Sequence, residues 1–207
     1  VIPILENCFG NDSRFTLIHG DILKTDVSAL LREHFAGMPV CVCANLPYYI
    51  TTDVLTKLMR ELPQAKSIAV MIQKEVGDKL LSGPGDDGYG PLAVMCQYRY
   101  HVMRALDVPA ACFNPPPKVD SSFMVLERLK QPCVNAGDEE IFTRLVRSAF
   151  AMRRKTLLNN LVSGFSLNRE QAAACLAAAN LSAQARAEEL SLEDFAGLAI
   201  QLQNAIR

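Results

Sequence analysis

Residues 40–50 read "VCVCANLPYYI", and this stretch decides the fold. Its first five residues are small or β-branched apolar side chains, which are typical of a buried strand. The apolar run stops at Asn45, and Pro47 then fixes the backbone where the strand ends. A helical pattern over residues 52–62 follows directly. The stretch therefore predicts a strand, a turn and a helix, which is the repeating unit of a parallel α/β sheet.

The same alternation extends outward in both directions. Strand-like runs occur at Phe15–His19, Val40–Ala44, Ser67–Ile72, Tyr100–Val108 and Ser121–Leu129. Helical patterns in the same region cover Val27–Phe35, Thr52–Leu62, Lys74–Leu81 and Pro91–Tyr98. The second and third strands are nearly all apolar, so we expect helices to cover both of their faces. The last two strands are joined by a proline-rich connection without a helix, so we expect one of them to run antiparallel.

The composition changes after Leu129. A linker, "KQPCVNAGDEE", is followed only by helical patterns, at Glu139–Phe150, Arg153–Val162, Arg169–Ala179 and Ser191–Ile206. Asn168 and Ser191 have the residue types of helix N-caps. We therefore predict an α/β domain over residues 1–131 and a small all-helical domain over residues 132–207.

The overall composition excludes some classes of protein. The 207 residues are 50% hydrophobic with a formal charge of −1, which argues against a general polyanion binder but not against a local basic patch. The seven cysteines form no C-x-x-C pair and only three histidines occur, so we expect no metal site. We interpret the cysteines as small core residues of a cytoplasmic protein. No apolar run approaches the roughly 18 residues of a membrane span, and we expect a monomer.

The sequence "GPGDDG" at residues 83–88 matches the G-x-G-x-x-G pattern of nucleotide-binding loops. Such a loop must follow a strand and open a helix, so that backbone N–H groups meet phosphate. This one follows a helical pattern, and Asp86 and Asp87 would repel phosphate. We interpret it as a mobile surface loop, hinged by its glycines, that acts as a lid beside the site.

Three motifs fall where strands end, the place where α/β sheets bind ligands. The first is "HGDIL", in which Asp21 follows the first strand. A carboxylate at this point can accept a hydrogen bond from an exocyclic amine such as that of adenine. The alternative is an aspartate that caps a turn or a helix.

The second motif is "NLPYYI" at residues 45–50. The side-chain oxygen of Asn45 and the carbonyl oxygen of Leu46 can accept both hydrogens of an aromatic amine, while Tyr48 offers a flat face. Held in this way, the nitrogen becomes more pyramidal, and its lone pair is freed to attack a cationic sulfonium. The alternative is a strand-to-helix turn with a buried tyrosine.

The third motif is "CFNPPPKVDSSF" at residues 112–123. Three consecutive prolines stiffen the segment, so Phe113 can be held against a base on the side opposite Tyr48. Each ring stacked on an unpaired base contributes about 1–3 kcal/mol. Lys118 can meet a phosphate. The alternatives are a structural proline loop and a ligand for the aromatic groove of a partner.

The segment 141–169 contains six basic residues and no acidic one. A continuous helix over "AFAMRRKTLLNNL" would place Arg147, Phe150 and Arg154 on one face, a combination that suits a phosphate backbone. The alternative is a solvated helix face. The residues that we expect to contact RNA are Lys118, Arg147, Arg153, Arg154 and Lys155.

Together these motifs resemble those of the ribosomal RNA adenine N6-dimethyltransferases. The stretches "GDIL", "NLPYYI", "QKEVGDKLL...YGPL", "FNPPPKVDSSF" and "AFAMRRKTLLNNL" occur in the family's order and span essentially the whole chain. The tandem of the second and fourth distinguishes this family from DNA adenine methylases and glutamine-amide methylases. The basic stretch and the helical tail look like the bacterial small-subunit branch more than the macrolide-resistance branch.

The resemblance implies a Rossmann-like class I methyltransferase sheet and a partner, the immature small ribosomal subunit. It implies S-adenosylmethionine-dependent N6-dimethylation of adjacent adenosines in 16S ribosomal RNA during ribosome assembly. It assigns catalytic roles to Asn45, Leu46, Tyr48 and Phe113. It assigns cofactor contacts to Asp21, Ile22 and Asn45.

The chain departs from the family at its beginning. The family has a glycine-rich loop after its first strand and an acidic residue at the end of its second, and neither is present. We therefore expect the first two strands to be missing, cofactor binding by this chain alone to be very weak, and a sheet edge to be exposed. Two other functions remain open: a non-catalytic RNA-binding or ribosome-assembly factor, and a protein glutamine-amide methyltransferase.

Overall fold

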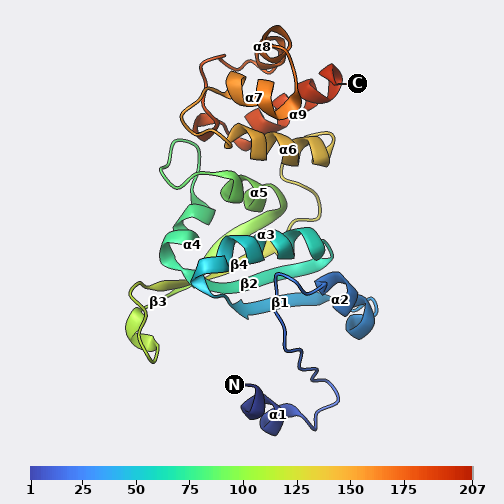
Figure 1. Ribbon diagram of the computed structural model, residues 1–207, viewed down its shortest axis with the longest axis vertical. Coiled ribbons are helices and arrows are strands. Elements are labelled where there is room, and N and C mark those ends of the chain that lie inside the picture. Colours follow the sequence, from blue (N-terminus) through green and yellow to red (C-terminus); the bar gives the residue numbers. More distant parts are fainter. Residues whose placement is uncertain (207) are drawn as a thin grey trace.

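The computed structural model describes residues 1–206 and places a four-stranded sheet below a group of helices (Figure 1). Its strands are β1 (Val40–Asn45), β2 (Ala65–Gln73), β3 (Tyr100–Val108) and β4 (Ser121–Arg128). The helices are α1 (Ile2–Phe9), α2 (Val27–Phe35), α3 (Thr51–Glu61), α4 (Lys74–Leu81), α5 (Pro91–Arg99), α6 (Glu139–Ala149), α7 (Leu157–Phe165), α8 (Arg169–Ala178) and α9 (Leu192–Ala205). Three short 3₁₀ turns are η1 (Tyr48–Ile50), η2 (Ala110–Cys112) and η3 (Ala187–Glu189).

The strands lie in the order β1-β2-β4-β3. β1 and β2 are parallel and are connected through α3, as the strand–turn–helix pattern predicts. β4 runs antiparallel to both β2 and β3, which confirms that one of the last two strands is reversed. In this register Asn45 lies opposite Met71, and Gln73 lies opposite Ser121. The ends of β1 and β2 and the start of β4 therefore meet at one edge of the sheet.

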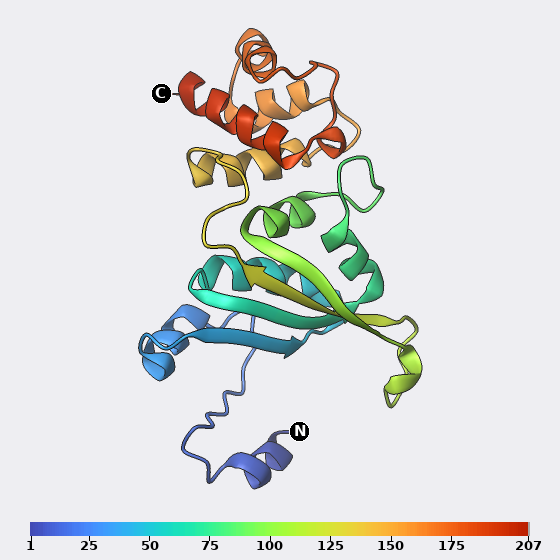
Figure 2. The ribbon, with the colours of Figure 1, turned by 180° about the vertical axis from the view of Figure 1, so that it is seen from behind.

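The strand expected at Phe15–His19 does not form. This segment leads from α1 toward the sheet without pairing to any strand among residues 1–206. Figures 1 and 2 show α1 and the following segment hanging beyond β1, away from the other strands. An alternating apolar pattern becomes a strand only where a neighbour supplies backbone hydrogen bonds. The outer edge of β1 has no neighbour in the described part of the chain.

Helices cover one face of the sheet. α3, α4 and α5 lie on the same side, and the view from behind exposes the other side (Figures 1 and 2). Ile68, Val70 and Ile72 of β2 are fully buried beneath these helices, whereas Cys41 and Cys43 of β1 point to the open face and are exposed. The expectation that both apolar strands are covered on both faces is therefore wrong.

The cysteines follow the same division. Cys96 and Cys175 are buried, and burial raises the pKa of the Cys96 thiol to about 12. The interpretation of all seven as core residues is wrong, because the remaining five are exposed: Cys8, Cys41, Cys43, Cys112 and Cys133.

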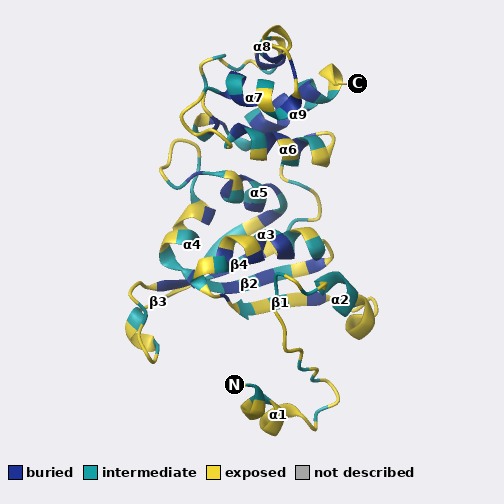
Figure 3. Cartoon of the chain, viewed as in Figure 1, coloured by how far each residue is buried: buried dark blue, intermediate teal, exposed yellow. Residues whose placement is uncertain are grey.

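Two hydrophobic cores are visible in the burial pattern (Figure 3). One lies between the sheet and α3 and α4, and the other lies among α6 to α9. α5 joins them, because Cys96 packs in the sheet core while Tyr98 packs in the helical core. The ring of Tyr98 stacks on that of Phe142 with centroids 4.1 Å apart. The division at residue 132 stays a prediction, and α5 contributes to the cores on both sides of it.

The "GPGDDG" loop connects α4 to α5 and contacts the helical part of the chain. The Gly85 amide donates to the carbonyl of Glu188 at 2.8 Å, and the next aromatic residue, Tyr89, donates to the carbonyl of Leu190 at 3.0 Å. Gly85 has φ +87°, a conformation that favours glycine. The loop lines neither of the cavities described below, so its contacts do not support the interpretation as a lid.

Phe142→Ala is expected to lower the free energy of unfolding by about 3–5 kcal/mol. The side chain is 0% exposed and stacks on Tyr98, so its loss leaves a cavity where α5 meets α6. Urea unfolding measures the effect. The control Phe35→Ala removes a 42% exposed ring and should cost little. Equal effects of the two substitutions would contradict the assignment of Phe142 to the core.

Candidate active site and RNA-binding surface

The turn after β1 is built by local hydrogen bonds. The Leu46 amide donates to the carbonyl of Met71 at 3.1 Å, which ties the end of β1 to β2. The Pro47 carbonyl accepts from the Ile50 amide and from the Thr51 hydroxyl, both at 3.2 Å, and these bonds start η1 and α3. Leu46 buries its side chain, whereas Asn45 is exposed. The turn therefore anchors one residue and presents the other.

Two oxygens in this turn remain available. Among residues 1–206, neither the side-chain amide of Asn45 nor the carbonyl oxygen of Leu46 has a hydrogen-bond partner. Such groups are normally satisfied by protein, water or ligand. The two neighbouring acceptors are thus free to bind a group that carries two hydrogens.

Tyr48 is fixed by a contact with the far strand of the site. Its hydroxyl lies 2.7 Å from the hydroxyl of Ser121, which is fully buried at the start of β4. The contact holds the ring at the mouth of the sheet. Sequence reasoning did not single out Ser121, and the only signal was its place in the quoted "VDSSF" stretch.

The proline-rich loop completes a cavity. Phe113 follows η2 and is half-buried, and the Asn114–Pro115 peptide bond is cis. A cavity of about 300 Å³, here called the first cavity, has a lining of Asn45, Leu46, Pro47, Tyr48, Phe113, Pro115 and Pro117. The structure therefore brings together the four residues for which a catalytic role is predicted, from segments far apart in the sequence.

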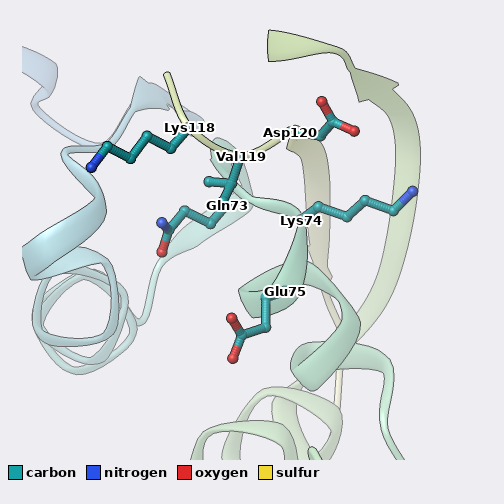
Figure 4. A pocket seen from close by; sticks show the side chains of 6 residues that line it. All are labelled: Gln73, Lys74, Glu75, Lys118, Val119 and Asp120. Carbon is teal, nitrogen blue, oxygen red and sulfur yellow. The ribbon is translucent and has the colours of Figure 1, made fainter.

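A second cavity of about 310 Å³ lies beside the end of β2 (Figure 4). Its lining consists of Gln73, Lys74, Glu75, Lys118, Val119 and Asp120. Lys118 therefore lies in this second cavity and not in the first.

Asp21 and Ile22 line neither cavity. The Asp21 carboxylate accepts the Leu23 amide through Oδ1 at 2.9 Å, as expected of the turn-capping alternative. Its Oδ2 lies 3.9 Å from Lys24 Nζ and has no hydrogen bond within residues 1–206. Ile22 packs against the sheet core. A cofactor role for either residue stays a prediction.

The basic segment is not one continuous helix, so that expectation is wrong. α6 ends at Ala149 and α7 begins at Leu157. Asn160, which is 2% exposed, donates through Nδ2 to the carbonyls of Ala149 at 2.6 Å and Met152 at 3.4 Å, and so holds the intervening turn.

Phe150 faces the helical core and not the basic side chains. Its ring stacks on that of Phe195 at a centroid distance of 5.9 Å and meets Tyr89 edge-on at 6.2 Å. The expected alternation of an aromatic ring with Arg147 and Arg154 on one face is therefore wrong.

The six cations of this segment divide into two groups. Arg144 lies over the Phe165 ring at 4.6 Å and donates to the Gly164 carbonyl, and Arg169 donates to Asn159 at 3.2 Å. The other four cations, whose exposed side chains have neither a hydrogen bond nor an ion pair within the described residues, are Arg147, Arg153, Arg154 and Lys155. Three of these lie in the turn between α6 and α7, here called the basic turn, where they can approach a polyanion.

Residues 1–206 offer neither a membrane-spanning helix nor a cluster of metal ligands. No helix in that range is long and apolar enough to cross a membrane. The same residues contain no group of three or more His, Cys, Asp or Glu side chains placed to hold a metal ion.

Comparison with known proteins gives one consistent family. The family model described as "Ribosomal RNA adenine dimethylase" matches residues 2–204. The ribosomal RNA small subunit methyltransferase A of Geobacillus sp. (strain WCH70) is 39% identical over 210 residues, which cover 100% of this chain and 72% of the relative. The protein of the same name from Oceanobacillus iheyensis is 42% identical over 202 residues, covering 96% of this chain and 69% of the relative.

Solved structures agree on the fold. A dimethyladenosine transferase from Plasmodium falciparum superimposes with a TM-score of 0.76 at 22% identity, covering 98% of this chain and 78% of the other. The 23S rRNA methyltransferase ErmE superimposes with a TM-score of 0.66 at 20% identity, covering 97% of this chain and 77% of the other. The sheet and its helices therefore have the Rossmann-like arrangement of these methyltransferases.

Proposed function

Because the chain belongs to the ribosomal RNA adenine dimethylase family, we propose that it holds its target adenine in the first cavity. The protein is a methyltransferase that dimethylates adenines of small-subunit ribosomal RNA. The observation that carries the assignment of the cavity is its lining, which combines Asn45 and Leu46 with Tyr48 and Phe113. An amide oxygen and a main-chain oxygen can accept the two hydrogens of an adenine amine, and two rings can stack on the base.

The residues that the resemblance assigns to S-adenosylmethionine fit that cofactor in part. Asn45 has a free side-chain amide in the first cavity, and Asp21 keeps one carboxylate oxygen without a hydrogen bond among residues 1–206. Ile22 offers an apolar side chain beside Asp21. When bound, S-adenosylmethionine supplies an electrophilic methyl group on a sulfonium centre.

Asn45 and Leu46 activate the amine by accepting its hydrogens. The lone pair of an adenine amine is delocalised into the ring, so the amine is a weak nucleophile. Oxygen acceptors on both hydrogens favour a pyramidal nitrogen, whose lone pair is localised and aimed away from the two oxygens. The same oxygens stabilise the positive charge that develops on the nitrogen during the reaction, until the nitrogen loses one proton to water.

Tyr48 and Phe113 hold the base in this orientation. A base must leave its stack before its amine can react, and aromatic rings compensate for the lost stacking. The hydroxyl of Tyr48, held by Ser121, fixes one wall, while the proline-rich loop positions Phe113 on the other.

The finer parts of the proposal concern the target and its setting. We propose that the two methyl groups go to N6 of adjacent adenosines and that the partner is the immature small subunit. The exposed cations of the basic turn support contact with that RNA. Since ribosomal subunits assemble in the cytoplasm of bacteria such as the named relatives, we place the reaction there.

Phe113→Ala is expected to raise the KM for RNA by about 5- to 150-fold, the equivalent of one stacked ring. Methyl transfer at increasing RNA concentration measures the change. Tyr49→Ala is the matched control, because Tyr49 is 86% exposed and lies outside the first cavity. Phe113→Tyr keeps the ring and should retain most of the affinity. An equal loss in Tyr49→Ala, or none in Phe113→Ala, would contradict stacking by Phe113.

The proposed function is tested with the protein, undermethylated small subunits and cofactor labelled on its methyl group. The RNA is digested and its nucleosides are separated. We expect label in N6,N6-dimethyladenosine. Binding to the subunit without transfer of label would instead indicate a non-catalytic assembly factor. Label in protein glutamine would indicate a glutamine-amide methyltransferase.

A further inference from the structure

The second cavity adjoins the first at the same edge of the sheet. Pro117 lines the first cavity and Lys118, the next residue, lines the second. On the other side, the Leu46 amide of the first cavity binds the carbonyl of Met71, two residues before Gln73. The two cavities are therefore neighbours along this edge. At about 310 Å³ the second cavity lies in the range of ligand sites.

Most charged side chains around the second cavity are already paired. Lys74 Nζ lies 3.3 Å from Asp107 Oδ2, and Glu75 accepts from Lys79 at 2.6 Å. The hydrogen bond from the Ser122 hydroxyl, followed by Lys74, holds the pKa of Asp107 below its usual value.

The carboxylate of Asp120, also in the second cavity, accepts the Ala110 amide at 2.9 Å. Among residues 1–206 the side chains of Gln73 and Lys118 have no such partner. Figure 4 shows both extending to the same side of the cavity, away from Lys74 and Asp120. The free groups in the second cavity are therefore one carboxamide and one ammonium.

We propose that the second cavity holds the nucleotide next to the target adenosine, with Gln73 reading an adenine base and Lys118 contacting phosphate. This inference rests on the proposed function. A carboxamide pairs with adenine through two hydrogen bonds, since its oxygen accepts from N6–H and its nitrogen donates to N7. A lysine ammonium is suited to a phosphate but carries no sequence information. Gln73 would thus make the enzyme specific for adenosines that have an adenosine neighbour.

The test is a cycle of protein and RNA changes. Small subunits are assembled with RNA in which either neighbour of one target adenosine is adenosine, purine riboside, which lacks the N6 amine, or 7-deazaadenosine, which lacks N7. Either replacement at one of the two neighbours should lower kcat/KM several-fold, because each removes one of the two hydrogen bonds to Gln73. Gln73→Ala should have a lower kcat/KM than the natural protein on the natural RNA. Its kcat/KM should be the same for all three nucleotides.

Gln73→Glu gives a sharper readout. Glutamate keeps an oxygen acceptor for N6–H but loses the donor for N7. The variant should therefore still discriminate against purine riboside and no longer against 7-deazaadenosine. Gln64→Ala is the matched control, because Gln64 is an exposed glutamine directly before β2, at the end of the strand opposite Gln73. This variant should discriminate among the three nucleotides as the natural protein does.

Lys118 is tested through salt. Lys118→Ala should weaken binding to all three RNAs equally and reduce the slope of log K against log salt by about 1. Lys66→Ala is the control, because Lys66 is an exposed lysine of β2 without an acidic partner among residues 1–206. It should change neither the affinity for RNA nor the slope of log K against log salt.

The possible failures are distinguishable. If the natural protein forms no dimethyladenosine on any RNA, the proposed function is wrong, and the inference fails with it. If dimethyladenosine forms but Gln73→Ala discriminates as the natural protein does, only the second cavity is misassigned. A uniform loss in Gln73→Ala, with discrimination unchanged, would likewise overturn the reading of a base by Gln73 and indicate a structural role.

Discussion

Asn45→Ala is expected to lower the rate of methyl transfer by about 100- to 1,000-fold, the cost of removing one preorganised group that stabilises a developing charge. The side chain lines the first cavity and has no partner among residues 1–206, so its oxygen is free for the amine. Because the interaction strengthens as charge develops, kcat should fall while RNA affinity stays nearly unchanged. Single-turnover methyl transfer at saturating RNA and cofactor measures the step.

The control for Asn45 separates chemistry from folding. Asn204→Ala removes an exposed amide near the end of α9 and should leave the rate unchanged. The exposed side chain of Asn45 predicts that Asn45→Ala changes the free energy of unfolding by at most about 0.5 kcal/mol. A rate within a few-fold of the natural protein would contradict activation of the amine by Asn45.

The triple variant Arg153→Ala, Arg154→Ala and Lys155→Ala is expected to lose several hundredfold in affinity for the small subunit at about 0.1 M salt. Each phosphate contact contributes about 0.9 to the slope of log K against log salt, so three contacts give about 2.7. Affinities of the natural protein and the triple variant should therefore converge near 1 M salt. Binding titrations at several salt concentrations measure both the loss and the slope.

A matched triple variant removes the same charge elsewhere. Arg32, Lys66 and Lys130 are exposed and lie outside both cavities and the basic turn. Replacing these three with alanine should change affinity and slope far less. An equal loss in the two triple variants would mean that RNA senses only the net charge, and would contradict a docking surface at the basic turn.

Much of the fold follows from local patterns. The apolar run before Asn45 predicted β1, and the helical periodicities predicted α2 to α6, α8 and α9 to within about two residues at most ends. The reversed last strand followed from the missing helix between β3 and β4. These features depend on residues close in sequence, which is why they could be read from it.

The failures depend on partners distant in sequence. Phe15–His19 has the pattern of a strand but no neighbour to pair with in the described chain. The break between α6 and α7 is held by Asn160, whose side chain reaches back to Ala149 and Met152. The exposed cysteines of β1 could not be foreseen, because which face the helices cover is decided by tertiary packing.

The candidate site divides in the same way. The rule that ligands bind beyond the carboxyl ends of strands was enough to place Asn45 and Phe113 at one edge. It did not identify Ser121, whose contact with Tyr48 joins β4 to η1, nor Gln73, whose side chain is recognised as free only once its neighbours are seen to be paired. Pairing between distant side chains is the information that one sequence lacks.

The most direct test is the structure of the full-length protein bound to its small-subunit RNA. We expect the target adenine between the rings of Tyr48 and Phe113, with N6 about 2.7–3.2 Å from both Asn45 Oδ1 and the Leu46 carbonyl oxygen. An adenine outside the first cavity, or one whose N6 faces neither oxygen, would contradict the proposed grip on the amine.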